Sequence, residues 1–182
     1  PFRILTATDD LQLYFFAAFA YPIRTLLVYP SPKHIYINSN LKSSKRKNII
    51  LISPTHRWGN KKSPLEKLLE KESFLKELKN LEFEIRYTLH PHSLNRSNSK
   101  IMSFNGEWSR VVSVITDYSS IGYDYFFSGG NNLIYYIPDI KEFELKEGHS
   151  PLFKMHAQNH NIALNLKSLY SYLRKIKELS IK

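Results

Sequence analysis

The sequence predicts an α/β fold in which a parallel β-sheet carries helices on both faces. Short runs such as residues 49–53 (IILIS) and 111–116 (VVSVIT) are apolar at nearly every position, which is typical of strands buried on both sides. Amphipathic stretches with helical spacing separate these runs, as expected for repeated strand–helix units. Polar clusters follow several of the runs, and parallel sheets bind ligands at the carboxyl ends of their strands.

The strands are predicted from short apolar or alternating runs bounded by turn signals. Residues 83–89 (FEIRYTL) alternate in polarity and end at a His-Pro-His sequence, and residues 132–137 (NLIYYI) are closed by Pro138. In chain order, the expected strands are residues 49–53, 83–89, 111–116 and 132–137, with a short element near residues 100–104.

The helices are predicted from apolar residues that recur at helical spacing, with charged residues on the remaining face. The first, residues 65–81, follows Ser63-Pro64, which offers an N-cap serine and a proline at the first helical position. The second, residues 118–127, is stopped by Gly129-Gly130. The third, residues 165–179, is amphipathic and rich in lysine.

The charge of the chain calls for an anionic partner. Of 182 residues, 26 are Lys or Arg and 16 are Asp or Glu, which leaves a net charge of +10. No acidic residue occurs from position 11 to 65, and the densest basic run, residues 42–48 (KSSKRKN), is predicted to be an exposed connector, unless it is only a solvated loop. We therefore divide the chain into residues 1–41, a remnant of an N-terminal domain or an appendage, the connector 42–48, and a domain of residues 49–182.

Cysteine is absent, which excludes disulfides, thiol catalysis and cysteine-bound metals and favours a cytoplasmic setting. The most apolar stretch, residues 11–29, is interrupted by Pro22 and Arg24, so we expect two buried elements there and not a membrane-spanning helix. The chain begins Pro-Phe-Arg without Met, from which we expect a processed chain or part of a longer protein.

The first polar cluster, Ser53-Pro54-Thr55-His56-Arg57, follows the strand 49–53. Thr55 and Arg57 carry donors suited to phosphate oxygens, although an ordinary polar loop would look the same. The second cluster is His90-Pro91-His92. No acidic or cysteine ligand lies close by to complete a metal site, so His90 is expected to contact a phosphate, to act as an acid–base group or to be structural.

The third cluster, residues 116–124 (TDYSSIGYD), places a serine pair where a helix begins. The free amides of a helix N-terminus together with two hydroxyls would suit a diphosphate, while the alternative for Asp117 is a plain N-cap. The chain lacks a Gly-x-Ser-x-Gly elbow, a Gly-x-Gly-x-x-Gly motif and a Walker A sequence. No carboxylate cluster stands at the strand ends, so we expect no catalytic metal.

Four segments occur in an order that one enzyme family shares. They are residues 49–57 (IILISPTHR), 89–92 (LHPH), 114–125 (VITDYSSIGYDY) and 135–144 (YYIPDIKEFE). Together they resemble the CDP-glycerol glycerophosphotransferase family, the teichoic acid polymerases and primases and their capsule-polymer relatives. The TDYSS block is the most specific part, and the resemblance covers about residues 48–145.

The resemblance implies a GT-B architecture, with two Rossmann-like domains facing a cleft. This chain would be mostly the C-terminal, nucleotide-binding half, and its partner would be the missing N-terminal domain. The implied activity is transfer of polyol phosphate from CDP-glycerol or CDP-ribitol to a hydroxyl of a cell-surface polymer, teichoic acid or capsule, with release of CMP. The implied location is the cytoplasmic face of the bacterial membrane.

The resemblance also assigns roles by position. The donor phosphates would be contacted by Thr55, Arg57, His90, Ser119 and Ser120, with His90 also catalytic. Asp117 would shape the loop, and Pro138, Asp139 and Glu142 would lie near the nucleotide. No tightly bound cofactor is expected, since the CDP-linked donor is a substrate.

Other functions remain open at this point. Many relatives continue with an Arg-Gly-aromatic element that residues 144–149 (ELKEGH) lack, which admits a GT-B glycosyltransferase or nucleotide-sugar enzyme that uses another donor. A nucleotide-binding fragment without turnover is a third alternative. Nucleic-acid binding is disfavoured, because no helix-turn-helix, zinc finger or RNP-like sheet is recognisable. Further expected partners are a polymer or lipid-linked acceptor and an anionic membrane surface, although the basic connector and C-terminal helix are equally consistent with a solvated face.

Overall fold

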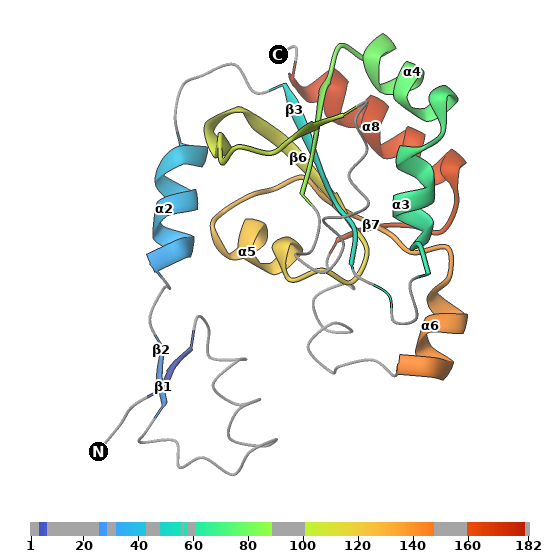
Figure 1. The fold of residues 1–182 in the computed structure, drawn as a ribbon. Coiled ribbons are helices and arrows are strands. Elements are labelled where there is room, and N and C mark those ends of the chain that lie inside the picture. The colour runs from blue at the N-terminus through green and yellow to red at the C-terminus, as the bar shows by residue number, and fades with distance from the viewer. Residues whose placement is uncertain are drawn as a thin grey trace.

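Figure 1 shows the computed structural model, in which a six-stranded parallel sheet carries helices on both faces. The structure describes residues 4–6, 26–28, 32–42, 48–55, 57, 61–88, 101–147 and 160–180. Most of the apolar stretch 11–29 and of the predicted connector therefore lies outside the described residues.

The strand order of the sheet is β5-β4-β3-β6-β7-β8, and every neighbouring pair is parallel. The strands are β3 (Ile49–Ser53), β4 (Glu84–Tyr87), β5 (Met102–Ser103), β6 (Val111–Thr116), β7 (Leu133–Tyr136) and β8 (Asn161–Ala163). The chain builds outward from β3 to β5, returns to the other side of β3, and builds outward again through β6 to β8. Such a reversal leaves a crevice at the carboxyl ends of β3 and β6, where doubly wound sheets bind ligands. A separate parallel pair, β1 (Ile4–Thr6) and β2 (Leu26–Val28), precedes this sheet in the chain.

The two faces of the sheet bury separate apolar clusters. Ile50 and Ile52 of β3 pack with α3 (Pro64–Leu69), α4 (Glu72–Asn80) and α8 (Leu166–Ser180). Ile49 and Leu51 pack on the opposite face with α2 (Pro32–Leu41), α5 (Ile121–Phe127) and the short 3₁₀-helix η4 (Trp108–Arg110). Because successive strand residues point to opposite faces, a strand covered on both sides must be apolar throughout, as the sequence of β3 is.

The predicted fold class and all four predicted strands are confirmed, and the element expected near residues 100–104 is β5. Strands β4 and β7 are each shorter than predicted by a few residues. Strand β8, at the sheet edge, and helix α6 (Ile140–Glu147) were not predicted.

The prediction of one helix over residues 65–81 is wrong, because the segment forms α3 and α4 with a break at Glu70 and Lys71. At about 100° per residue, Phe74 would lie roughly opposite Leu65 on a continuous helix. The break turns the apolar residues of both helices toward the same side, and both sets join one core cluster.

The helix predicted over residues 118–127 begins only at Ile121, so Tyr118, Ser119 and Ser120 belong to a loop. The C-terminal helix is confirmed as α8. Helix α2 was not predicted, and its Ile37 and Leu41 are buried in the second core cluster. The division of the chain at residues 42–48 stays a prediction. Among the described helices, none is both long enough and apolar enough to cross a membrane.

Candidate functional site

The candidate site lies at the carboxyl ends of β3 and β6, where the direction of strand addition reverses. Thr55 and Arg57 follow β3, and Asp117 follows β6 directly. Strands β3 and β6 are neighbours in register, with Ser53 opposite Thr116, so the loops after them are brought together. The hydroxyl of Thr116 donates to the Ser53 carbonyl over 2.6 Å and ties the two strand ends to each other.

Asp117 joins these two loops. Its Oδ1 accepts hydrogen bonds from the Thr55 amide over 2.7 Å and from the Tyr118 amide over 2.8 Å. Its Oδ2 lies 3.4 Å from Nη2 of Arg57. The carboxylate is fully buried, and this burial raises its pKa above the ordinary value, against the opposing effect of the Arg57 guanidinium. Asp117 thus shapes the loop geometry.

Arg57 is fixed by charges and by aromatic rings. Its Nη2 donates to Asp139 over 3.1 Å, in addition to the contact with Asp117. The guanidinium carbon lies 4.9 Å from the ring centre of Tyr118 and 4.5 Å from that of Phe143. These two rings are themselves stacked, with centres 3.7 Å apart. Such contacts hold an arginine in one geometry before any ligand arrives.

The second terminal nitrogen of Arg57, Nη1, is buried and has no hydrogen-bond acceptor among the described residues. The same holds for Oδ1 of Asp139. Buried polar atoms are normally paired, so each of these atoms is suited to a partner that the described residues do not supply. A guanidinium with one bound and one unused terminal nitrogen can bind an oxyanion without first breaking its own support.

The serine pair contributes less than the sequence suggested. The Ser119 hydroxyl lies 3.5 Å from the Ser53 hydroxyl and accepts from the Ile121 amide over 3.5 Å. Ser120 precedes α5, is exposed and makes no side-chain capping bond. Because α5 has seven residues, under two turns, the helix-terminus cradle expected from a longer helix is only partly built.

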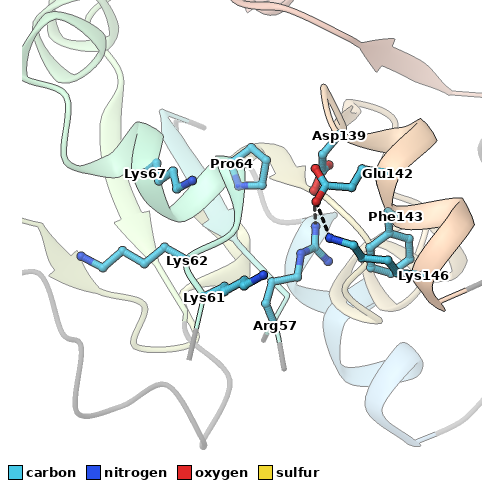
Figure 2. Close-up of a pocket in the computed structure, with 9 residues that line it drawn as sticks. All are labelled: Arg57, Lys61, Lys62, Pro64, Lys67, Asp139, Glu142, Phe143 and Lys146. Carbon is cyan, nitrogen blue, oxygen red and sulfur yellow. Dashed lines mark hydrogen bonds and ion pairs between the residues drawn. The ribbon is translucent and has the colours of Figure 1, made fainter. Parts of the chain in front are cut away.

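A cavity of about 360 Å³ adjoins Arg57 (Figure 2). One wall comes from the segment that leads into α3 and from α3 itself, and the other from α6 and the turn before it. The lining residues are Arg57, Lys61, Lys62, Pro64, Lys67, Asp139, Glu142, Phe143 and Lys146. Five cations and two carboxylates line the cavity, a balance that favours an anionic ligand. The ammonium of Lys62 is paired with Glu70 outside the cavity, and Figure 2 shows this side chain extending away from Asp139 and Glu142.

Two local features position the backbone beside the site. Helix α3 starts with a capping box, in which the Ser63 hydroxyl accepts from the Glu66 amide and the Glu66 carboxylate accepts from the Ser63 amide. Gly122 of α5 allows close packing against β6 and β7, since a Cβ there would lie 2.9 Å from the Tyr135 hydroxyl. Both features position backbone next to the site.

The predicted site residues divide into three groups. Thr55, Arg57, Asp117 and Asp139 form one connected network, and Glu142 lines the adjoining cavity. Ser119, Ser120 and Pro138 lie on the neighbouring loops and do not line this cavity. His90 lies outside the described residues.

Sequence reasoning missed Tyr118 and Phe143, which hold Arg57, and the lysines of the cavity. The aromatic residues were within quoted motifs, but nothing in their spacing indicated stacking between positions 25 residues apart. Lys61 and Lys62 were visible as part of a basic segment without acidic residues. Only the fold brings Lys61 opposite Lys146 across the cavity.

Comparisons with known proteins give the family of the chain and support its fold. The family described as CDP-Glycerol:Poly(glycerophosphate) glycerophosphotransferase matches residues 27–180. No curated protein sequence matches the chain. Among solved structures, that of the wall teichoic acid polymerase TagF matches with a TM-score of 0.69 and 17% identity, over 98% of this chain and 51% of that one.

A histidine variant of TagF soaked for 30 minutes with CDPG matches with a TM-score of 0.63 and 18% identity, over 98% of this chain and 49% of that one. The chain therefore spans about half the length of the TagF structures. These likenesses support the fold, and the sequence match covers most of the chain. The chain belongs to the CDP-glycerol:poly(glycerophosphate) glycerophosphotransferase family.

Proposed function

We propose that this chain is the donor-binding part of a transferase that moves polyol phosphate from a CDP-activated polyol, glycerol or ribitol, to a hydroxyl of a cell-surface polymer. The observation that carries the proposal is Arg57, which is held by Asp117 and Asp139. Its buried Nη1 has no acceptor among the described residues and lies beside a cationic cavity. Membership of the family supplies the donor and acceptor class.

In this reaction, the acceptor hydroxyl oxygen attacks the phosphorus that bears the polyol. The bond between that phosphorus and the oxygen bridging the two phosphates breaks, and CMP leaves with the bonding electrons. The hydroxyl proton passes to a base, for which we propose His90. Such a transfer depends mostly on positioning and on neutralising phosphate charge, which a fixed arginine and neighbouring lysines supply.

The other assigned residues take supporting roles in the proposal. Thr55, Ser119 and Ser120 contact the donor phosphates from the loops after β3 and β6, and Asp117 keeps these loops together. Asp139 and Glu142, with Pro138 at the end of β7, lie on the nucleoside side. We expect no tightly bound cofactor, because the CDP-linked donor is a substrate, and no catalytic metal, because the polar clusters at the strand ends lack a group of carboxylates.

Calorimetric titration with CDP-glycerol and CDP tests this proposal. The chain should bind both, and Arg57→Ala should weaken binding by at least about tenfold, the scale of one lost charge-assisted hydrogen bond. Arg174→Ala is the matched control, since Arg174 lies on α8 and pairs with Glu77 away from the cavity. Thermal unfolding should first show that the Arg57 variant and the wild type are both folded. Equal affinity of the two proteins for these ligands would then contradict the role of Arg57 in phosphate binding.

The same titration with UDP and GDP separates the proposal from the alternative of a GT-B glycosyltransferase with another NDP-sugar donor. A response to UDP or GDP alone would contradict the cytidine donor. An assay for CMP release in the presence of polymer acceptor then tells a transferase from a nucleotide-binding fragment without turnover.

We also propose that the parent enzyme works at the inner face of the bacterial membrane, with a second, N-terminal domain that supplies the acceptor surface. Two cations of α8 are already engaged, because Arg174 pairs with Glu77 and Lys177 with Glu82. The basic segment 42–48 therefore carries more of the expected attraction to anionic lipid. Salt-sensitive sedimentation with anionic vesicles is the expected result, and its absence would contradict the membrane role.

A further inference from the structure

The cavity beside Arg57 contains a carboxylate that the binding of an anion does not need. Glu142 lines the cavity together with four lysines, and its Oε1 lies 2.5 Å from Nζ of Lys146. Figure 2 shows this pair on the α6 side, with Lys61 and Lys67 on the other side. Glu142 and Lys146 are four residues apart on α6, so the pair forms within one helix and requires no ligand.

The lysines of the cavity act on Glu142 as a group. Lys146 lowers the pKa of Glu142 most strongly, by a hydrogen bond and by its charge, and Lys61 and Lys67 lower it further from the opposite wall. The Glu142 carboxylate is therefore attracted by the lysines on both sides of the cavity, Lys146 on one side and Lys61 and Lys67 on the other. An incoming phosphate would be attracted by the same lysines and would compete with Glu142 for them.

Asp139 provides a contrast within the same cavity. It is mostly buried and bonded to Arg57, so it is part of the support of the site. Glu142 is mostly exposed, with 69% of its side chain accessible, and within the described part of the chain its ion pair is with Lys146, which is also exposed. An exposed ion pair of this kind is weak and is easily exchanged for a stronger partner.

We propose that Glu142 is a competing carboxylate, which pairs with Lys146, draws on the positive charge of Lys61 and Lys67, and is displaced by the phosphates of a bound ligand. Glu142 thereby lowers the affinity of the cavity for its anionic ligand and favours release of the anionic product. The inference rests on the anion-binding part of the proposed function, but not on the identity of the nucleoside. By position Glu142 is expected only to lie near the nucleotide, and this inference adds that its charge opposes the binding of the ligand's phosphates.

Calorimetric titration of wild type and Glu142→Gln with inorganic pyrophosphate and with CDP separates these roles. If Glu142 competes, the Gln variant binds both ligands more tightly, by roughly threefold or more, the scale for removing one like charge about 6 Å away in water. The gain should disappear at about 1 M salt, where the screening length falls to about 3 Å.

Glu144→Gln is the matched control, because Glu144 lies on the same helix, is exposed and does not line the cavity, and the variant loses the same charge. The Glu144 variant should bind both ligands with the affinity of the wild type. If it gains as much affinity as the Glu142 variant, the effect comes from the net charge of the chain, and the proposal is overturned.

Each other outcome is also decisive. A Gln variant that loses affinity for CDP but not for pyrophosphate would show a favourable contact with the nucleoside and overturn competition. Unchanged binding of both ligands would overturn this inference and leave the proposed function standing. If neither ligand binds to the wild type or to the variant, both the proposed function and the inference fail.

Discussion

At the scale of single residues, Asp117 is the group on which the site geometry depends. It accepts two backbone amides and contacts Arg57, and thereby joins the loop after β3 to the loop after β6. A buried carboxylate with this many donors is expensive to replace, since each orphaned buried donor costs about 1–3 kcal/mol. Arg57 in turn depends on Asp117, Asp139 and two stacked rings.

The raised pKa of Asp117 predicts how the stability of the protein changes with pH. Burial raises the native pKa above the ordinary 3.8, so the native state holds this proton more tightly than the unfolded chain. The contribution of Asp117 to the free energy of unfolding is therefore greatest below 3.8 and falls as the pH rises through the native pKa. Asp117→Asn cannot titrate. The difference in unfolding free energy, wild type minus variant, should decline across this window in urea titrations, whereas a rise with pH would contradict the account.

At the scale of secondary-structure elements, the position of α5 sets the loop of Tyr118, Ser119 and Ser120. The helix approaches β6 and β7 closely at Gly122, where a Cβ would lie 3.1 Å from Thr116 Cγ2 as well as near Tyr135. Neither neighbour can easily move, because Thr116 and Tyr135 are both fully buried. The fit of one helix on the sheet is thus linked to the geometry of the site.

Gly122→Ala should therefore destabilise the protein by about 1–3 kcal/mol, the usual cost of overpacking, and should also weaken CDP binding. Gly106→Ala is the control: Gly106 has a φ of +88°, so alanine is strained there, but a Cβ would meet no atom within 4 Å. Both variants should lose stability in denaturant titrations, but only the Gly122 variant should lose affinity. Equal affinity of the two variants for CDP would show that the packing of α5 does not affect the site.

The sequence was sufficient to predict the central strands, because a strand covered on both faces must be apolar throughout. It was also sufficient to place Arg57 and Asp117 at strand ends, where parallel sheets bind ligands. The break between α3 and α4 could not be predicted from the sequence, because each half alone has the pattern of a good helix. Only the position of the sheet shows that the apolar residues of both halves must point to the same side. The stack of Tyr118 on Phe143 and the facing of Lys61 toward α6 depend on the tertiary packing of distant segments, which periodicity does not encode.

At the scale of the whole molecule, the described sheet has the strand order of a complete doubly wound unit, and its switch point holds the candidate site. The chain spans about half the length of the TagF structures that it matches. The net charge of +10 is partly concentrated where a phosphate ligand would need it, in the five cations around the cavity. The composition alone predicts an anionic partner without saying where it binds, and the structure places part of the positive charge at this cavity.

The most direct measurement is the position of a bound nucleotide in a crystal of this chain soaked with CDP. Our account predicts diphosphate density at the carboxyl ends of β3 and β6, within hydrogen-bond distance of Nη1 of Arg57, with Glu142 moved away from Lys146. A diphosphate bound at another place on the chain, with Nη1 of Arg57 still unpaired, would contradict it.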